Sequence, residues 1–149
     1  MYLWNDPDAT IVRAALEANC SMPAHAINVL EWAHGSLTAQ QVVVLGATYQ
    51  GGVNETAFSG VFAVVDELKK RNAHVMVHDP MFTDKEIKEL GFTPFVPGQS
   101  VDAAVLQADH VEYKTWSIDD LPGIRTLLNG RRLPLMHLEE ICRVVSVGD

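Results

Sequence analysis

The chain has 149 residues, 48% of them hydrophobic, and its formal net charge is −8. This length and hydrophobic content fit a single domain that can bury a core without disulfides or a structural metal. The acidic charge argues against nucleic acid and anionic membranes as partners, because both would repel such a surface.

Nothing in the sequence indicates export or membrane insertion. The start, Met1-Tyr-Leu-Trp-Asn-Asp6, lacks the basic residues and apolar core of a signal peptide, and no apolar run is long enough to cross a bilayer. Cys20 and Cys142 lie far apart without C-x-x-C spacing, which is typical of reduced structural thiols. We therefore expect a cytoplasmic protein.

A helical pattern begins the chain. Asp6 can cap this helix, and Pro7 fits its first turn. The pattern continues to Gly35, with apolar residues at helical spacing on both sides of Pro23: Ile11, Val12, Ala15 and Leu16 before it, and Ala26, Ile27, Val29, Leu30 and Ala33 after it. Because proline lacks the backbone donor that a helix interior needs, we expect either one kinked helix or two short ones.

After the helical segment, apolar runs alternate with helical patterns, which predicts a mainly parallel sheet. We expect strands at 41–45, 74–78, 103–107, 133–137 and 143–147, with a short sixth candidate at 92–96. We expect helices at 57–72 and 83–90, and a third within 117–128. The expected fold is a Rossmann-like, three-layer α/β domain at 37–149, preceded by a long or kinked helical segment at 1–36.

The turn after the first strand carries the main functional signal. The strand, 41–45, is apolar enough for the interior of a parallel sheet, and Gly46 ends it. Gly51 and Gly52 permit a sharp turn and a close approach to a ligand, and the next helix presents N–H groups to an anion such as phosphate. The spacing matches neither G-x-G-x-x-G nor a Walker A loop, so the glycines alone are weakly specific.

Four blocks of the sequence occur together in the order of one known family. They are Leu45-Gly-Ala-Thr-Tyr-Gln-Gly-Gly-Val-Asn-Glu-Thr-Ala-Phe-Ser59, Val75-Met-Val-His-Asp-Pro80, Ala104-Val-Leu-Gln-Ala-Asp-His-Val-Glu-Tyr113 and Asn129-Gly-Arg-Arg132. Together they resemble the C-terminal, UDP-sugar-binding domain of the UDP-glucose/GDP-mannose 6-dehydrogenase family. Residues 13–23 resemble the helix that joins this domain to the family's central domain, and 143–148 resemble its C-terminus.

The resemblance implies NAD-dependent oxidation of a nucleotide-sugar C6 hydroxyl to a carboxylate. In such enzymes one domain holds NAD, a central domain carries the catalytic cysteine, and the C-terminal domain closes over the UDP-sugar. Neither cysteine of this chain lies in the family's G-x-x-G-x-C-F-P-like motif. We therefore expect a UDP-sugar-binding domain without a catalytic residue and without bound cofactor of its own, while NAD serves the full-length enzyme.

Residue by residue, the resemblance implies substrate binding by Tyr49, Gln50, Gly51 and Arg131. The family's aromatic-lysine pair falls on Tyr49 and Gln50, so the charge-assisted part of that contact is lost. The arginine that holds the nucleotide falls on Arg131, whose planar fork can bind phosphate in two bonds. The family's NAD-contacting arginine falls on Ala57, so no cofactor contact is expected from this turn.

Other polar residues have less to recommend them as sites. Asp79 at a strand end can bind a ribose hydroxyl or cap a turn, and the following proline favours capping. Asp109-His110 also lies at a strand end, but no G-x-S-x-G elbow accompanies it. The six histidines show no metal-binding spacing, so we expect no metal site.

Two functional classes remain open. The chain is either the UDP-sugar-binding part of a dehydrogenase or a non-catalytic assembly or regulatory module that has lost ligand binding, as the changes at Gln50 and Ala57 would permit. The apolar face of the N-terminal segment predicts a homodimer. The sequence does not decide which sugar is bound, or whether the nucleotide is UDP or GDP.

Overall fold

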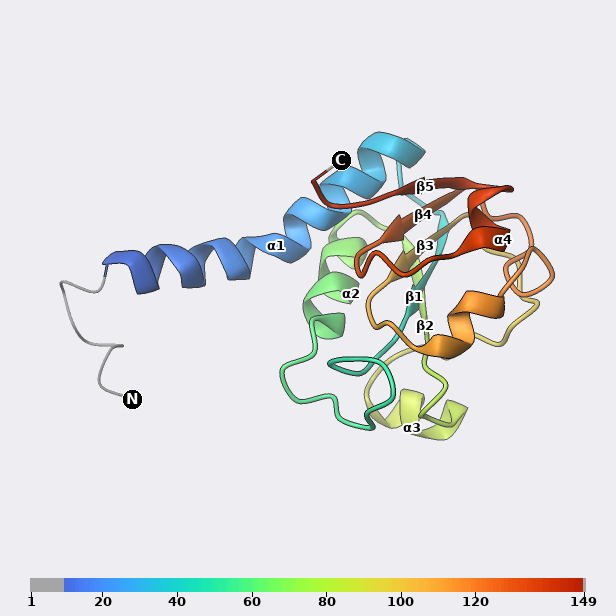
Figure 1. The fold of residues 1–149 in the computed structure, drawn as a ribbon, viewed down its shortest axis with the longest axis horizontal. Helices are drawn as coiled ribbons and strands as arrows, with labels where there is room; N and C mark the ends of the chain where they lie inside the picture. Colours follow the sequence, from blue (N-terminus) through green and yellow to red (C-terminus); the bar gives the residue numbers. More distant parts are fainter. Residues whose placement is uncertain (1–9, 149) are drawn as a thin grey trace.

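The computed structural model describes residues 10–148 and contains one sheet of five parallel strands (Figure 1). In chain order the strands are β1 (Gln41–Leu45), β2 (His74–His78), β3 (Ala103–Leu106), β4 (Thr126–Asn129) and β5 (Arg143–Val145). Their order across the sheet is β2-β1-β3-β4-β5, with every neighbouring pair parallel. The direction of winding therefore reverses between β1 and β3, which is the switch point of a doubly wound sheet. The expected Rossmann-like α/β fold is confirmed.

Strand β1 is buried on both faces. Val42 and Val44 contact one hydrophobic cluster, whereas Val43 and Leu45 contact the other. The first cluster lies under α1 (Thr10–His34), α2 (Val61–Lys70) and α3 (Asp84–Glu89), and the second lies under a 3₁₀ helix (Val111–Thr115), α4 (Met136–Glu139) and the loops around them. Alternation of side chains across two covered faces explains why the strand reads as one continuous apolar run.

The N-terminal segment forms one continuous helix, α1, with Pro23 inside it. The alternative of two short helices is therefore wrong for the described residues, and the predicted cap at Asp6 and Pro7 lies outside them. Only the second half of α1 packs on the domain, through Ile27 and Leu30, and its first half projects away from the sheet (Figure 1). No helix within residues 10–148 is long and apolar enough to cross a membrane.

Two predicted elements near the C-terminus are wrong. The helix expected within 117–128 is replaced by turns and by β4, whose residues are all buried. The strand expected at 133–137 is a loop leading into α4. Periodicity misled both predictions, because a four-residue buried strand has no alternation to read, while Leu133 and Leu135 alternate inward from a loop.

A side-chain contact holds that loop in place of strand pairing. The side-chain NH₂ of Asn129 donates to the carbonyl of Leu133 at 2.7 Å, and the side-chain oxygen of Asn129 accepts from the N–H of Leu133 at 3.0 Å.

Two other elements differ from the prediction by a smaller amount. Helix α2 begins four residues later than expected, because Phe58 adopts a left-handed conformation with φ of 63°. The candidate strand at 92–96 is reduced to one bridge between Val77 and Pro94.

We predict that Gly46→Ala destabilises the fold more than Gly35→Ala does. Both glycines have positive φ, 101° and 95°, so each alanine carries a similar backbone strain of about 1–3 kcal/mol. Only at Gly46 would the new Cβ lie 2.4 Å from the Cβ of Ala108, which adds an overpacking cost of about 1–3 kcal/mol. Urea unfolding followed by circular dichroism measures both, and equal losses would contradict the close packing of this turn.

Candidate functional site

The candidate site lies at the carboxyl ends of β1 and β3, where open α/β sheets bind ligands. The loop after β1, residues 46–60, meets the loop after β3, residues 107–110. Glycines permit this contact: a Cβ on Gly51 would lie 2.4 Å from the carbonyl oxygen of Asp109. Because Gly51 has no side chain, the loop after β1 and the loop after β3 can come into contact at the switch point of the sheet.

A buried carboxylate, Asp79, holds the start of the first loop. Its Oδ2 accepts from the N–H groups of Ala47 at 2.7 Å and Thr48 at 3.0 Å, and its Oδ1 accepts from Met81 N–H at 2.8 Å. Burial raises the pKa of Asp79, but the hydrogen bonds from His110, Met81 and Ala47 outweigh it and hold the pKa below the usual value. Asp79 therefore caps the turn, as expected, and its carboxylate faces protein donors.

His110 connects this carboxylate to the glycine turn. The ring is fully buried, and its Nε2 lies 2.8 Å from Thr48 Oγ1 and 3.1 Å from Asp79 Oδ2. Its Nδ1 accepts from the N–H of Gly52 at 3.2 Å, so Nδ1 carries no proton and Nε2 is the donor. A single imidazole thus ties the ends of β2 and β3 to the turn after β1.

Tyr113 and Trp116 form an aromatic contact next to this hydrogen-bond network. The hydroxyl of Tyr113 donates to the carbonyl of His78 at 3.0 Å, and the ring lies 4.9 Å from Trp116, centroid to centroid. Burial raises the pKa of Tyr113 well above its ordinary value, which keeps the hydroxyl a donor. Sequence reasoning noted His110 only as half of an Asp-His pair and missed Thr48 and Tyr113, because their roles depend on contacts between distant segments.

The four predicted substrate-binding residues lie together at this edge. Arg131 donates from Nε to the carbonyl of Gln107 at 2.7 Å and from Nη2 to the carbonyl of Tyr49 at 2.6 Å. The Tyr49 side chain is 52% exposed, and Gln50 is exposed beside it. Arg131 therefore already uses part of its planar guanidinium to join the two loops.

The backbone N–H of Gly51 already has a hydrogen-bond acceptor within the protein. It donates to Asp109 Oδ1 at 3.0 Å. This hydrogen bond lowers the pKa of Asp109, and the Arg131 charge lowers it further, although partial burial opposes both. The position therefore already holds an anion, which is the carboxylate of Asp109. Arg132, next to Arg131, has a left-handed backbone conformation with φ of 52°.

A cavity of about 610 Å³ opens beside Arg131. It lies between α1, the start of α2 and the carboxyl ends of β3 and β4, and its volume is in the usual range for small-molecule sites. Its walls are mostly apolar. The polar side chains of the lining are those of Asn19, Ser59, Gln107 and Arg131, and Phe58 is almost fully exposed among them. Among residues 10–148, no cluster of three or more histidine, cysteine or acidic side chains is placed to hold a metal ion.

Comparison with known proteins identifies a family for this arrangement. The model of the UDP-glucose/GDP-mannose dehydrogenase family, UDP binding domain, matches residues 43–132. The UDP-N-acetyl-D-mannosamine dehydrogenase of Methanococcus vannielii is 28% identical over 126 residues, covering 83% of this chain and 29% of that protein. The corresponding enzyme of Methanococcus maripaludis is 30% identical over 119 residues, covering 78% of this chain and 27% of that protein. The chain thus spans less than a third of these curated relatives.

Solved structures show the same fold. A UDP-glucose dehydrogenase from Pyrobaculum islandicum superposes with a TM-score of 0.72 at 26% identity, over 86% of this chain and 30% of that chain. The UDP-N-acetyl-mannosamine dehydrogenase of Staphylococcus aureus gives a TM-score of 0.75 at 21% identity, over 95% of this chain and 34% of that one. The second likeness supports the fold alone.

We predict that Asp79→Asn lowers the free energy of unfolding by about 3 kcal/mol at neutral pH. The NH₂ group of asparagine is a hydrogen-bond donor, so it would face a backbone N–H group that needs an acceptor. The lowered pKa of Asp79 makes its contribution complete above the unfolded-state pKa and lost as pH falls through the folded-state pKa. The difference between wild type and variant should therefore shrink in acid. Urea unfolding across pH measures this.

The control is Asp119→Asn at an exposed acid. We expect this control to unfold like the wild type throughout the pH range. An Asp79→Asn variant as stable as the wild type at neutral pH would contradict the role of the buried carboxylate.

Proposed function

This chain belongs to the UDP-glucose/GDP-mannose dehydrogenase family, and from that membership we propose that it is the UDP-sugar-binding part of an NAD-dependent UDP-sugar 6-dehydrogenase. In this proposal it closes over a substrate that is oxidised by parts of the enzyme that the chain does not span. The observation that carries the proposal is the convergence of Arg131, Tyr49 and the Gly51 turn beside a cavity of about 610 Å³.

Each predicted residue has a role in binding. The free donors of Arg131 hold a phosphate oxygen, and the half-exposed ring of Tyr49 contacts the sugar or base. Gln50 donates a neutral hydrogen bond, which is weaker than the bond of a lysine at that position. The Arg131 guanidinium also joins the two loops, so its loss affects both the phosphate contact and the shape of the turn.

The residues of this turn do not fit NAD. At the position where the family resemblance expects an arginine, Ala57 offers no charged group, and its N–H donates to the carboxylate of Glu55 at 2.8 Å. That carboxylate would repel the pyrophosphate of a dinucleotide. We therefore assign no NAD contact to this chain and leave cofactor binding to the remainder of the enzyme.

The named relatives favour one class of sugar. The Methanococcus proteins are UDP-N-acetyl-D-mannosamine dehydrogenases, so we propose a UDP-N-acetylhexosamine as the first ligand to test and UDP-glucose as the second. We place this activity in the cytoplasm, where the free thiols of Cys20 and Cys142 stay reduced.

A second candidate function is a non-catalytic assembly or regulatory module. It is favoured by the internal use of the Gly51 N–H, by the neutral Gln50 and by the absence of a charged side chain at Ala57. Such a module would keep the fold and bind no nucleotide.

We predict that the chain binds UDP and that Arg131→Ala weakens binding about 10- to 100-fold, which is the loss expected for a charged hydrogen bond. Calorimetric titration with UDP, a UDP-N-acetylhexosamine and GDP measures this, and Arg132→Ala on the same turn is the matched control. If Arg131→Ala binds UDP as tightly as the wild type, the phosphate-binding site does not include Arg131. Failure of the wild type to bind any of these nucleotides would favour the non-catalytic module.

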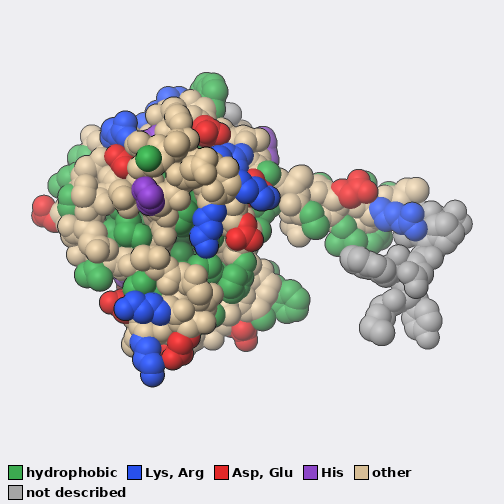
Figure 2. Space-filling model, turned by 180° about the vertical axis from the view of Figure 1, so that it is seen from behind, with side chains coloured by type: hydrophobic (Ala, Val, Ile, Leu, Met, Phe, Trp, Pro, Cys, Tyr) green, Lys and Arg blue, Asp and Glu red, His purple; other side chains and the backbone are tan. Residues whose placement is uncertain are grey.

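The projecting half of α1 bears on assembly. Ile11 is 84% exposed, and Val12, Leu16 and Met22 are also more than a third exposed. Figure 2 shows hydrophobic side chains along this part of the helix. In our proposal, the segment at residues 1–36, which contains α1, pairs with a second copy, and residues 37–149 are the binding domain. An apolar helical face of this kind is typical of an interface.

We predict that the wild type sediments as a dimer at micromolar concentration and that the double variant Ile11→Glu, Leu16→Glu sediments as a monomer. The introduced charges would have to be buried at the interface, which is strongly unfavourable. Ile118→Glu, at an exposed apolar position on the domain itself, is the control and should remain dimeric. A monomeric wild type in analytical ultracentrifugation would contradict the proposal.

A further inference from the structure

Six backbone N–H groups of the turn at residues 47–57 are already engaged inside the protein. A turn that binds phosphate uses free backbone N–H groups. Here these groups donate to acceptors of the chain itself: Ala47 and Thr48 to Asp79, Tyr49 to the carbonyl of Glu55, Gly51 to Asp109, Gly52 to His110, and Ala57 to the carboxylate of Glu55. A phosphate can therefore take one of these six N–H groups only by replacing its present acceptor.

The acceptors differ in how easily they can be displaced. Asp79 is 2% exposed and His110 is fully buried, so moving either would open the core beneath the sheet edge. Asp109 is exposed, and its side chain can turn into solvent while the buried frame stays intact. Asp109 is therefore, like the exposed Glu55 carboxylate on Ala57, an acceptor that a ligand can displace without opening the core.

Asp109 also occupies the electrostatic position of a phosphate. Its carboxylate accepts the Gly51 N–H at 3.0 Å, and it lies near enough to Arg131 for the arginine charge to stabilise its ionised form. Arg131 is the residue proposed to hold the nucleotide, and its fork also contacts the carbonyls of both loops. Gln50 adds no positive charge, so an incoming phosphate meets one arginine and the negative charge of Asp109.

We propose that Asp109 is a specificity-determining residue of this site: its carboxylate holds the place of a phosphate group on the Gly51 N–H beside Arg131, and a phosphate takes this N–H only by displacing the carboxylate. The inference rests on the proposed function. Its consequence is selectivity, because inorganic phosphates offer little beyond charge to offset the displacement. A nucleotide sugar also gains contacts in the apolar cavity.

A purely structural Asp109 makes a different prediction. Asparagine keeps the oxygen that accepts the Gly51 N–H and removes only the charge. If Asp109 merely joins the two loops, Asp109→Asn should leave ligand affinity unchanged. If Asp109 competes with phosphate, the same variant should bind phosphate ligands more tightly.

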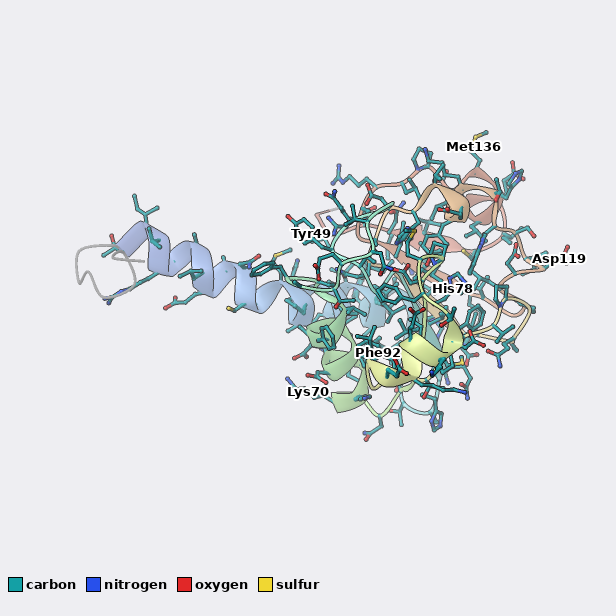
Figure 3. The ribbon with its side chains drawn as sticks, turned by 90° about the horizontal axis from the view of Figure 1, so that it is seen from below. Tyr49, Lys70, His78, Phe92, Asp119 and Met136 are labelled. Carbon is teal, nitrogen blue, oxygen red and sulfur yellow. The ribbon has the colours of Figure 1, made fainter. Side chains whose placement is uncertain are left out.

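The test is calorimetric titration of the full chain and two variants with UDP and with inorganic pyrophosphate. We expect Asp109→Asn to bind UDP about 5- to 10-fold more tightly than the wild type, as removal of one nearby like charge predicts. We expect a larger relative gain for pyrophosphate, and both gains should shrink at high salt. Asp119→Asn, on the opposite side of the molecule from Tyr49 (Figure 3), removes the same charge and should match the wild type.

The outcomes separate this inference from the proposed function. If the wild type binds UDP and Asp109→Asn binds it equally or more weakly, the inference is overturned and the proposed function stands. If neither the wild type nor Asp109→Asn binds UDP, both are overturned. Asp109→Ser, a second uncharged variant, repeats the test if the asparagine variant unfolds, and urea unfolding of each variant confirms that the compared proteins are folded.

Discussion

The carboxylate of Asp79 is the contact on which the rest of the site depends. It lies at the end of β2 and accepts N–H groups from the turn after β1, while His110 brings the loop after β3 to the same oxygen. Three neighbouring strands therefore end on one buried charge. A buried carboxylate is stable only when its oxygens are well hydrogen-bonded, so the two loops must keep these positions for the fold to tolerate it.

The position of Arg131 follows from this frame. Its guanidinium bridges the carbonyl of Tyr49, in the loop after β1, and the carbonyl of Gln107, in the loop after β3. The two carbonyls can share one planar fork only while the loops stay together, which Gly46 and Gly51 allow by omitting a side chain at each contact. Packing thus positions the site. The glycines let the two loops come close together, the buried polar side chains hold them there, and Arg131 joins the loops at the exposed edge.

The amino-acid sequence was sufficient for the fold class and for both strands whose boundaries matched, β1 and β2. It failed at β4, because a short strand covered on both faces lacks any periodic signal. The family resemblance singled out Tyr49, Gln50, Gly51 and Arg131, and the fold places these four residues at the same edge of the sheet. Hydrogen bonds that define the site join residues far apart in the sequence: Arg131 and Gln107 lie 24 positions apart, Gly52 and His110 lie 58 apart, and Arg131 and Tyr49 lie 82 apart. Such contacts arise from strand order, which local patterns do not encode.

The balance of charge at this edge determines where binding energy must come from. A phosphate loop that relies on free N–H groups and a lysine attracts almost any phosphate. Here the lysine position is Gln50, the Gly51 N–H is engaged by Asp109, and the one nearby arginine also holds the loops together. Phosphate charge alone therefore contributes little net attraction in the proposed site. In the proposed function, the remaining contribution comes from the walls of the adjoining cavity. The proposal therefore makes recognition depend on the whole nucleotide sugar more than on its diphosphate.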